Sequence, residues 1–226
     1  MELYLIRHGQ SANNANPGGE RHPDPQLTEV GHQQAEQLAE WAKSAGLSRI
    51  ISSPFLRALQ TAEYVRQAAD VPAEIWNDVF EQGGCCAGAD PSLDLGAIDY
   101  QGVAGMTDAE IRQGYPHFQI PPEIDERGWW RERPFEPMQE AHTRAESVVE
   151  RTRELFAHSD ERVAIIFHGM FKNLILGAFF EKSIIDHLWL EVSYNTGISK
   201  LTLTPDGIKL AYYNSATHLS ESLLTS

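Results

Sequence analysis

The stretch YLIRHGQSANN, residues 4–14, passes directly from an apolar segment into an arginine, a histidine and a glycine. Residues 2–6 are apolar enough to predict a short buried strand. Arg7 and His8 therefore come at the end of that strand. Two ionisable side chains in such a place lose hydration, and partners elsewhere in the chain must offset that cost.

Two further strand-like segments end in residues of the same kind. RIISSP, residues 49–54, predicts a second short strand, and Arg57 follows it by one helical turn. RVAIIFHG, residues 162–169, predicts the strongest strand in the sequence and ends in His168 and Gly169. Because the carboxyl ends of parallel strands meet at one edge of a sheet, we expect the ionisable side chains there to converge. They are Arg7, His8, Arg57 and His168.

Helical segments separate these strands. Apolar residues recur at helical spacing between Thr28, an expected N-cap, and Gly46, and also in residues 55–69, 140–157 and 170–180. Residues 73–81 predict a third strand, and residues 197–214 predict a hairpin around a Pro-Asp-Gly turn. The alternation of strand and helix favours an α/β fold, a three-layer α/β/α sandwich with a mostly parallel central sheet.

The stretch 82–137 differs in character, because glycine and proline interrupt it repeatedly. We expect one domain, residues 1–226, with an insertion at about 82–137 that covers the mouth of the active site. A short helix is expected near residues 107–113. Two explanations fit Trp129 and Trp130 within this insertion: packing of the insertion itself, or a lid of aromatic side chains over a substrate.

Composition limits the partners. The 226 residues carry a formal charge of −14, which argues against binding to nucleic acid or to an anionic membrane surface. A run of about 18 apolar residues, as a membrane span needs, is absent from the sequence, and so is a secretory signal pattern. Adjacent Cys85 and Cys86 are expected to be reduced thiols. We expect a cytoplasmic protein.

The converging arginines and histidines indicate a phosphate site. A guanidinium group is permanently charged and can form two parallel hydrogen bonds to phosphate oxygens. Helix N-termini that follow the strands add backbone N–H donors. Since the protein as a whole is acidic, this local concentration of arginine is needed to attract a phosphorylated small molecule.

The histidines can also react. A neutral imidazole, with an ordinary pKa of about 6.5, is a nucleophile. If His8 attacks phosphorus, a phosphohistidine forms, and the charge that develops can be met by Arg7, Arg57 and a protonated His168 without a metal or cofactor. Departure of the leaving group then needs a proton from a carboxylic acid.

With these residues in view, the sequence resembles the histidine phosphatase superfamily, which includes the cofactor-dependent phosphoglycerate mutases. The resemblance extends over nearly the whole chain. The segments that carry it are LIRHGQSANN, QLTEVGHQQAEQLAEW, IISSPFLRALQTAEYV, VFEQGG, IIFHGMFKNLIL, YNTGISKL and YNSATHL.

The resemblance implies roles for individual residues. It makes His8 the nucleophile, and it assigns the phosphoryl group to Arg7, Arg57 and His168. It points to Glu81 as the proton donor, with Asp78 close enough in sequence to be a rival. Ser11, Asn14 and Gly169 would be further substrate-binding residues, although Ser11 and Asn14 are equally typical of a turn.

Departures from the family pattern concern the substrate. Gln10 replaces the more frequent glutamate, and MQEAHTR, residues 138–144, keeps Glu140 and Arg144 but lacks the small residues of the family's Gly-Glu-Ser stretch. An adjacent arginine pair followed by prolines, with which the mutases hold their substrate, is missing from the sequence.

These observations favour a metal-independent phosphomonoester hydrolase that acts through a phosphohistidine. Two alternatives stay open: a phosphoglycerate mutase, and a phospho-ligand-binding protein without catalysis. The sequence does not reveal the oligomeric state, and a homodimer is compatible with it.

Overall fold

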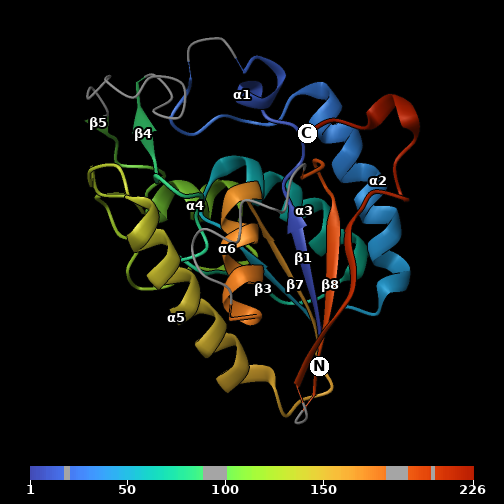
Figure 1. Ribbon diagram of the computed structural model, residues 1–226. Helices are drawn as coiled ribbons and strands as arrows, with labels where there is room; N and C mark the ends of the chain where they lie inside the picture. Colours follow the sequence, from blue (N-terminus) through green and yellow to red (C-terminus); the bar gives the residue numbers. More distant parts are fainter. Residues whose placement is uncertain (18–20, 89–100, 182–192, 205–206) are drawn as a thin grey trace.

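The computed structural model describes residues 1–17, 21–88, 101–181, 193–204 and 207–226. A seven-stranded sheet runs through its centre in the order β6-β3-β2-β7-β1-β8-β9 (Figure 1). The strands are β1 (Glu2–Arg7), β2 (Arg49–Ser52), β3 (Ala73–Ile75), β6 (Phe118–Gln119), β7 (Arg162–Phe167), β8 (Ile198–Thr204) and β9 (Gly207–Ser215). β6, β3, β2, β7 and β1 pair in parallel, whereas β8 and β9 are antiparallel. The sheet is therefore mostly parallel, as expected.

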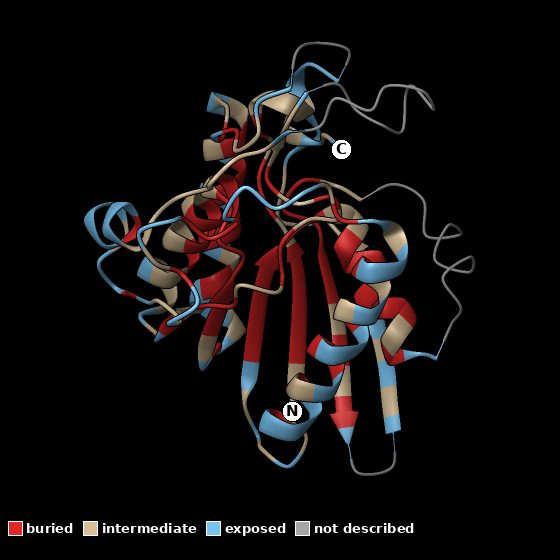
Figure 2. Ribbon diagram, turned by 90° about the vertical axis from the view of Figure 1, so that its left-hand side faces the viewer, coloured by how far each residue is buried: buried red, intermediate tan, exposed pale blue. Residues whose placement is uncertain are grey.

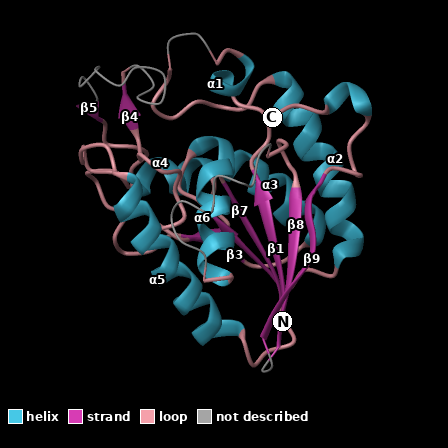
Figure 3. Cartoon of the chain, viewed as in Figure 1, coloured by secondary structure: helices cyan, strands magenta, loops and turns pink. Residues whose placement is uncertain are grey.

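Helices cover both faces of the sheet (Figure 3). The longer ones are α2 (Glu29–Ala45), α3 (Leu56–Ala69), α5 (Met138–Phe156) and α6 (Gly169–Phe179). The shorter elements are α1 (Ala12–Ala15), α4 (Asp108–Gly114), the strand pair β4 (Cys86–Ala87) and β5 (Gln101–Gly102), and the 3₁₀ turn η2 (Glu221–Leu223). Helix α4 lies where the sequence predicts a short helix.

Alternation along the strands divides the core into two layers. Tyr4 and Ile6 of β1 pack with α2 and α3 on one face, and Leu3 and Leu5 pack with α5 and α6 on the other. Neighbouring side chains on a strand point to opposite faces, so a strand buried on both sides must be apolar throughout. Figure 2 shows the central strands buried between the helices. The fold is the expected three-layer α/β/α sandwich.

The third strand is shorter than predicted. β3 ends at Ile75, whereas residues 73–81 were expected to continue as a strand. The last ladder bond runs from the Trp76 N–H to the Ser52 carbonyl, and the chain then turns at Asn77 and Asp78. Asparagine and aspartate favour turns over strands. This turn carries the following residues toward α6.

Part of the expected insertion belongs to the main sheet. β6, which lies within residues 82–137, pairs in parallel with β3 and forms the sheet edge. Trp129 and Trp130 are 1% and 2% exposed, with ring contacts to Phe55 and Phe80. Packing, the first of the two explanations for these tryptophans, accounts for their position.

The expectation of two reduced thiols is confirmed. Cys85 and Cys86 are free thiols. Of the helices in the described residues, none combines the length and the apolar character that crossing a bilayer requires. Glu140, which the stretch MQEAHTR keeps together with Arg144, is exposed in the first turn of α5. Arg144 instead pairs with Glu136, which precedes the helix, because that carboxylate reaches the guanidinium from the helix entry.

Candidate active site

Strand register brings the two histidines together. Arg7 at the end of β1 lies opposite Phe167 at the end of β7, so the next residues, His8 and His168, leave the sheet side by side. Their ring centroids are 5.2 Å apart. His8 is 3% exposed and His168 is fully buried. The sequence therefore predicted this pairing correctly from the strand ends.

Arg57, on the first turn of α3, joins the two rings. Its Nε donates to Nε2 of His8 at 3.0 Å, and its Nη2 donates to Nδ1 of His168 at 3.1 Å. The Phe55 ring lies under the guanidinium, 4.1 Å from Cζ, and against His168. Arg57 is only 8% exposed, so its guanidinium is largely removed from water.

These bonds assign a proton to each imidazole. Because Nε2 of His8 accepts from Arg57, its hydrogen lies on Nδ1, which donates to the Gly9 carbonyl at 2.6 Å. In His168, Nδ1 accepts from Arg57, so Nε2 donates to the Ser53 hydroxyl at 2.8 Å. Both rings are thus neutral, and the lone pair of His8 Nε2 faces the Arg57 guanidinium.

Electrostatics agree with neutral rings. Burial, followed by the charges of Arg57 and Arg7, holds the pKa of His8 well below 6.5. Burial and the Arg57 charge also hold the pKa of His168 well below 6.5. Without a bound phosphoryl group His168 is therefore neutral, and the expectation of a protonated His168, which concerns the filled site, stays a prediction.

Arg7 reaches a different partner. Its Nη1 donates to the Ser193 carbonyl, while its buried Nε has no hydrogen-bond partner within the described part of the chain. Burial lowers the pKa of Arg7 to about 10, which leaves it charged at neutral pH. An unpaired, buried, cationic donor beside the histidines is suited to an anionic oxygen.

Glu81 lies at the N-terminus of α6. Its Oε1 accepts from the Phe171 N–H at 2.9 Å, and its Oε2 accepts from the Met170 N–H at 3.3 Å. Helix α6 begins directly after His168, so the carboxylate and that ring share one helix end. Asp78, the rival carboxylate, is ion-paired to Arg151 at 2.6 Å. Of the two acids, Glu81 is the one held at the edge where the histidines lie.

Ser11, Asn14 and Gly169 also lie around this edge. Ser11 donates to the Asn14 carboxamide oxygen through both its backbone N–H, at 3.1 Å, and its hydroxyl, at 3.0 Å. These bonds show the turn-forming role that the sequence allowed. A Cβ at Gly169 would lie 3.5 Å from Arg7 Nε, which is an ordinary contact distance, so Gly169 lies beside Arg7 but is not required there for space.

Sequence reasoning missed several residues that support this site. Asn195, fully buried, donates to the His8 carbonyl at 3.1 Å. Lys172, also fully buried, donates to the Ser193 hydroxyl at 2.7 Å. A lysine within the apolar segment MFKNLIL was a visible signal, whereas nothing near Asn195 in the sequence pointed to His8.

Asp24 is a second missed group. Its Oδ1 accepts from the Leu56 N–H at 2.8 Å and so caps α3, the helix that carries Arg57. Burial raises the pKa of Asp24 to about 6, and the Arg57 charge opposes that shift. Capping by a residue from a distant loop cannot be read from local sequence.

Taken together, an α/β sandwich with two guanidinium groups and two neutral imidazoles at the carboxyl edge of its sheet defines a class of protein suited to bind a phosphoryl group. The particular family follows from comparison. The chain belongs to the histidine phosphatase superfamily (branch 1), whose family model matches residues 3–216.

Two curated relatives carry the same name. The probable phosphoglycerate mutase GpmB of Proteus mirabilis is 32% identical over 130 residues, which cover 54% of each chain. The protein of the same name from Enterobacter sp. is 34% identical over 113 residues, 49% of this chain and 46% of its own. The chain thus matches about half the length of these relatives.

Solved structures match over almost the full length. Bacillus stearothermophilus YhfR superposes with a TM-score of 0.68 at 25% identity, covering 97% of this chain and 99% of its own. A phosphoserine phosphatase variant from Entamoeba histolytica, in complex with phosphoserine, has a TM-score of 0.68 at 20% identity, with coverage of 97% and 99%. A mycobacterial glucosyl-3-phosphoglycerate phosphatase in complex with VO3 has a TM-score of 0.65 at 22% identity, covering 95% and 99%. The last two support the fold alone.

Proposed function

We propose that this protein is a phosphomonoester hydrolase that acts through a phosphohistidine on His8. One observation carries the proposal: His8 Nδ1–H donates to the Gly9 carbonyl, so that the lone pair of Nε2 lies in the cationic part of the site, beside Arg57. The low pKa of His8 keeps Nε2 unprotonated at neutral pH. A binding protein would need the arginines but not an imidazole held in this tautomer.

The first step transfers the phosphoryl group. His8 Nε2 attacks phosphorus, the Nε2–P bond forms, and the bond from phosphorus to the ester oxygen breaks. Arg57 and Arg7 neutralise charge on the phosphoryl oxygens, so the protein itself supplies the positive charge. The leaving oxygen takes a proton from Glu81, which must enter this step protonated.

The second step returns the enzyme to its starting state. Glu81, now a carboxylate, accepts a proton from water, whose oxygen attacks phosphorus as the Nε2–P bond breaks. Inorganic phosphate leaves, and His8 is again neutral. A bound dianionic phosphoryl group also raises the pKa of His168 by direct attraction, so that ring can gain a proton when the site is filled.

The substrate is proposed to be a phosphorylated small molecule. Two structural neighbours are a phosphoserine phosphatase, in complex with phosphoserine, and a glucosyl-3-phosphoglycerate phosphatase. In this chain we propose that the stretch 82–137 covers the mouth of the site and selects the alcohol portion of the ester. The 226 residues are proposed to form one domain around it.

Phosphoglycerate mutase activity is the second candidate. The names of the curated relatives favour it, but they match only about half of their own length. The missing arginine pair favours water over a second sugar-acid hydroxyl as the phosphoryl acceptor. Incubation with 3-phosphoglycerate separates the two, since a mutase yields 2-phosphoglycerate and a hydrolase yields inorganic phosphate.

A chromogenic phosphate ester tests the proposal. We expect the wild-type protein to release phosphate in excess chelator and His8→Ala to lose nearly all turnover, because a covalent role has no substitute. A panel of sugar phosphates, phosphoacids, nucleotides and phosphopeptides then defines the preferred ester. Wild-type inactivity towards every ester, or full activity of His8→Ala, would refute hydrolysis through His8.

A further inference from the structure

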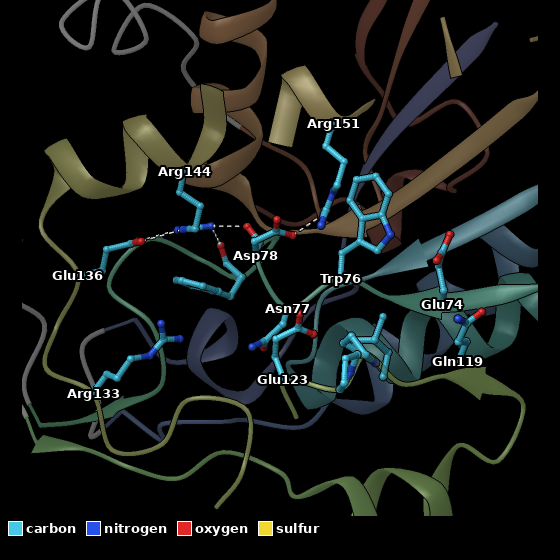
Figure 4. A pocket seen from close by; sticks show the side chains of 14 residues that line it. Glu74, Trp76, Asn77, Asp78, Gln119, Glu123, Arg133, Glu136, Arg144 and Arg151 are labelled. Carbon is cyan, nitrogen blue, oxygen red and sulfur yellow. Dashed lines mark hydrogen bonds and ion pairs between the residues drawn. The ribbon is translucent and has the colours of Figure 1, made fainter. Parts of the chain in front are cut away.

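Arg144 of α5 contacts the chain segment that leads to Glu81. Its Nη1 donates to the Asp78 carbonyl at 2.8 Å and to the Phe80 carbonyl at 3.0 Å (Figure 4). Glu81 is the residue that follows. The Nε and Nη2 atoms of Arg144 donate to the two carboxylate oxygens of Glu136 at 2.7 Å and 2.5 Å, which makes a bidentate ion pair. The guanidinium is therefore fixed at one end by a carboxylate and holds two backbone carbonyls at the other.

The same guanidinium also packs against the helix on which Glu81 rests. Its Cζ lies 3.6 Å from the Phe80 ring centroid and 3.9 Å from that of Phe171. Phe171 is the residue whose backbone N–H donates to Glu81. Arg144 thus lies between the two segments that the Glu81 carboxylate bridges.

Burial gives these contacts weight. The side chains of Arg144 and Glu136 are 12% and 8% exposed. Charged groups removed from water require nearly complete pairing, and loss of one partner leaves a costly unpaired charge. The backbone at Asp78 and Phe80 has left the sheet at Ile75, so strand pairing no longer holds it. Arg144 supplies hydrogen bonds there in place of a neighbouring strand.

We propose that Arg144, oriented by Glu136, is a positioning residue that holds Glu81 at the N-terminus of α6 for proton transfer to the leaving group. The inference rests on the proposed function. Arg144 itself touches neither the substrate nor the phosphoryl group in this account. Its loss should therefore impair only the step that needs the Glu81 proton.

Leaving-group dependence separates this role from general support of the fold. An ester of a weakly acidic alcohol, such as an alkyl phosphate, needs the proton, whereas 2,4-dinitrophenyl phosphate does not. Replacing Arg144 alone would leave Glu136 unpaired, so the test uses Arg144→Met together with Glu136→Met, an apolar replacement of the pair. We expect kcat for the alkyl ester to fall at least roughly tenfold, and kcat for the dinitrophenyl ester to change less than about twofold.

Arg151→Met is the matched control. Arg151 comes from the same helix and bonds to Asp78, but through the carboxylate and not through the backbone before Glu81. The Arg151→Met variant should leave the ratio of kcat for the alkyl ester to kcat for the dinitrophenyl ester unchanged. Glu81→Gln should reproduce the selective loss, and adding the Arg144 and Glu136 changes to it should cause no further loss for the alkyl ester. Arg144→Lys, which retains the charge but not the fork, should give part of the loss.

Equal losses for both esters, or no loss, would overturn the inference while leaving hydrolysis through His8 intact. If the wild-type protein hydrolyses neither ester, the proposed function fails, and amide hydrogen exchange then decides the positioning claim by itself. We expect the Met170 and Phe171 amides, which donate to Glu81, to exchange faster in the Arg144 and Glu136 double variant than in Arg151→Met. Unchanged exchange would contradict it.

Discussion

At the scale of single residues, the site depends on hydrogen bonds that fix which nitrogen of each ring carries the proton. In the proposed mechanism His8 attacks through Nε2, because Nδ1 donates to the Gly9 carbonyl. The Asn195 carboxamide donates to the His8 carbonyl. The Nε2–H of His168 donates to the Ser53 hydroxyl. An imidazole held at both nitrogens presents one reacting atom in one direction, which lowers the entropic cost of attack.

Lys172 is a fully buried lysine, and burial disfavours its charged form. Burial, with a further contribution from the Arg7 charge, lowers its pKa from 10.5 to about 7. Its Nζ contacts the Ser193 hydroxyl and lies over the Tyr213 ring at 5.1 Å. Between about pH 7 and pH 10.5 the unfolded chain therefore binds a proton at Lys172 that the folded protein does not.

The stability cost follows this sign. The destabilisation is fully present below about pH 7 and disappears as the pH rises toward 10.5, and it corresponds to at most roughly 5 kcal/mol. We predict that Lys172→Met is more stable than the wild type at pH 7 and that the difference shrinks with rising pH. Urea unfolding over this pH range measures it, with exposed Lys43→Met as a control that should change little. A variant that is less stable at pH 7 and gains on the wild type as the pH rises would contradict the prediction.

At the scale of elements, the first turn of α2 packs directly on the loop that carries His8. A Cβ at Gly31 would lie 2.1 Å from the Gln10 backbone oxygen, and one at Gly9 would lie 2.6 Å from the Gly31 oxygen. Two glycines therefore let the helix and the loop approach more closely than any side chain permits. The Gly9 N–H in turn donates to Thr61 of α3.

Substitution of Gly31, which lies in this contact, and of Gly114, which does not, should change stability in opposite directions. Gly31→Ala should lower stability by about 1–3 kcal/mol and reduce kcat, since the backbone must shift. Gly114→Ala should raise stability by about 0.5–1 kcal/mol, because a Cβ there meets nothing within 4 Å and alanine is the better helix former. Thermal unfolding and steady-state kinetics on both variants test the pair. If the two variants changed stability equally, the close approach of helix and loop would not be the reason for glycine at position 31.

Elements were predictable where a pattern is local. The apolar strands ending at Arg7 and Phe167 and the helical repeats that follow gave the sandwich and the meeting of His8 with His168. The end of β3 was not predictable, because AEIWNDVFE keeps a strand-like composition past Ile75. The turn there is stabilised by Arg144, which lies more than sixty residues away.

At the scale of the whole molecule, the C-terminal residues 223–225 pack against α2 and the loop that supports His8. Gln34 of α2 donates to the Leu223 carbonyl at 2.7 Å and to the Thr225 hydroxyl at 2.8 Å. Thr225 donates to the carboxamide oxygen of Asn195 at 3.0 Å, and Asn195 donates to the His8 carbonyl. Figure 1 shows this stretch, in red, beside α2. Four parts of the chain that are distant in sequence therefore meet beside His8.

Thr225→Val tests this connection. Loss of the hydroxyl leaves buried groups of Gln34 and Asn195 without a partner, which should cost about 1–3 kcal/mol of stability. A displaced His8 carbonyl should also lower kcat by roughly tenfold. Thr225→Ser keeps the hydroxyl and should retain both properties. Full activity of Thr225→Val would show that the Thr225 hydroxyl does not influence the site around His8.

Long-range arrangements of this kind are what the sequence could not supply. Residues at strand ends follow from topology, and so the meeting of His8, Arg57 and His168 was expected in advance. Asn195, Thr225 and Gln34 act through contacts that only the folded chain creates, and no spacing rule connects them.

The central claim is that His8 carries the phosphoryl group during turnover. Rapid quenching of the wild-type protein with an excess of ester, followed by peptide mass spectrometry under alkaline conditions, tests it most directly. We predict one phosphoryl group on His8, formed within the first turnover, stable in alkali, labile in acid and absent from His8→Ala. Phosphate release at the full rate without such an adduct, or an adduct on another residue, would contradict the claim.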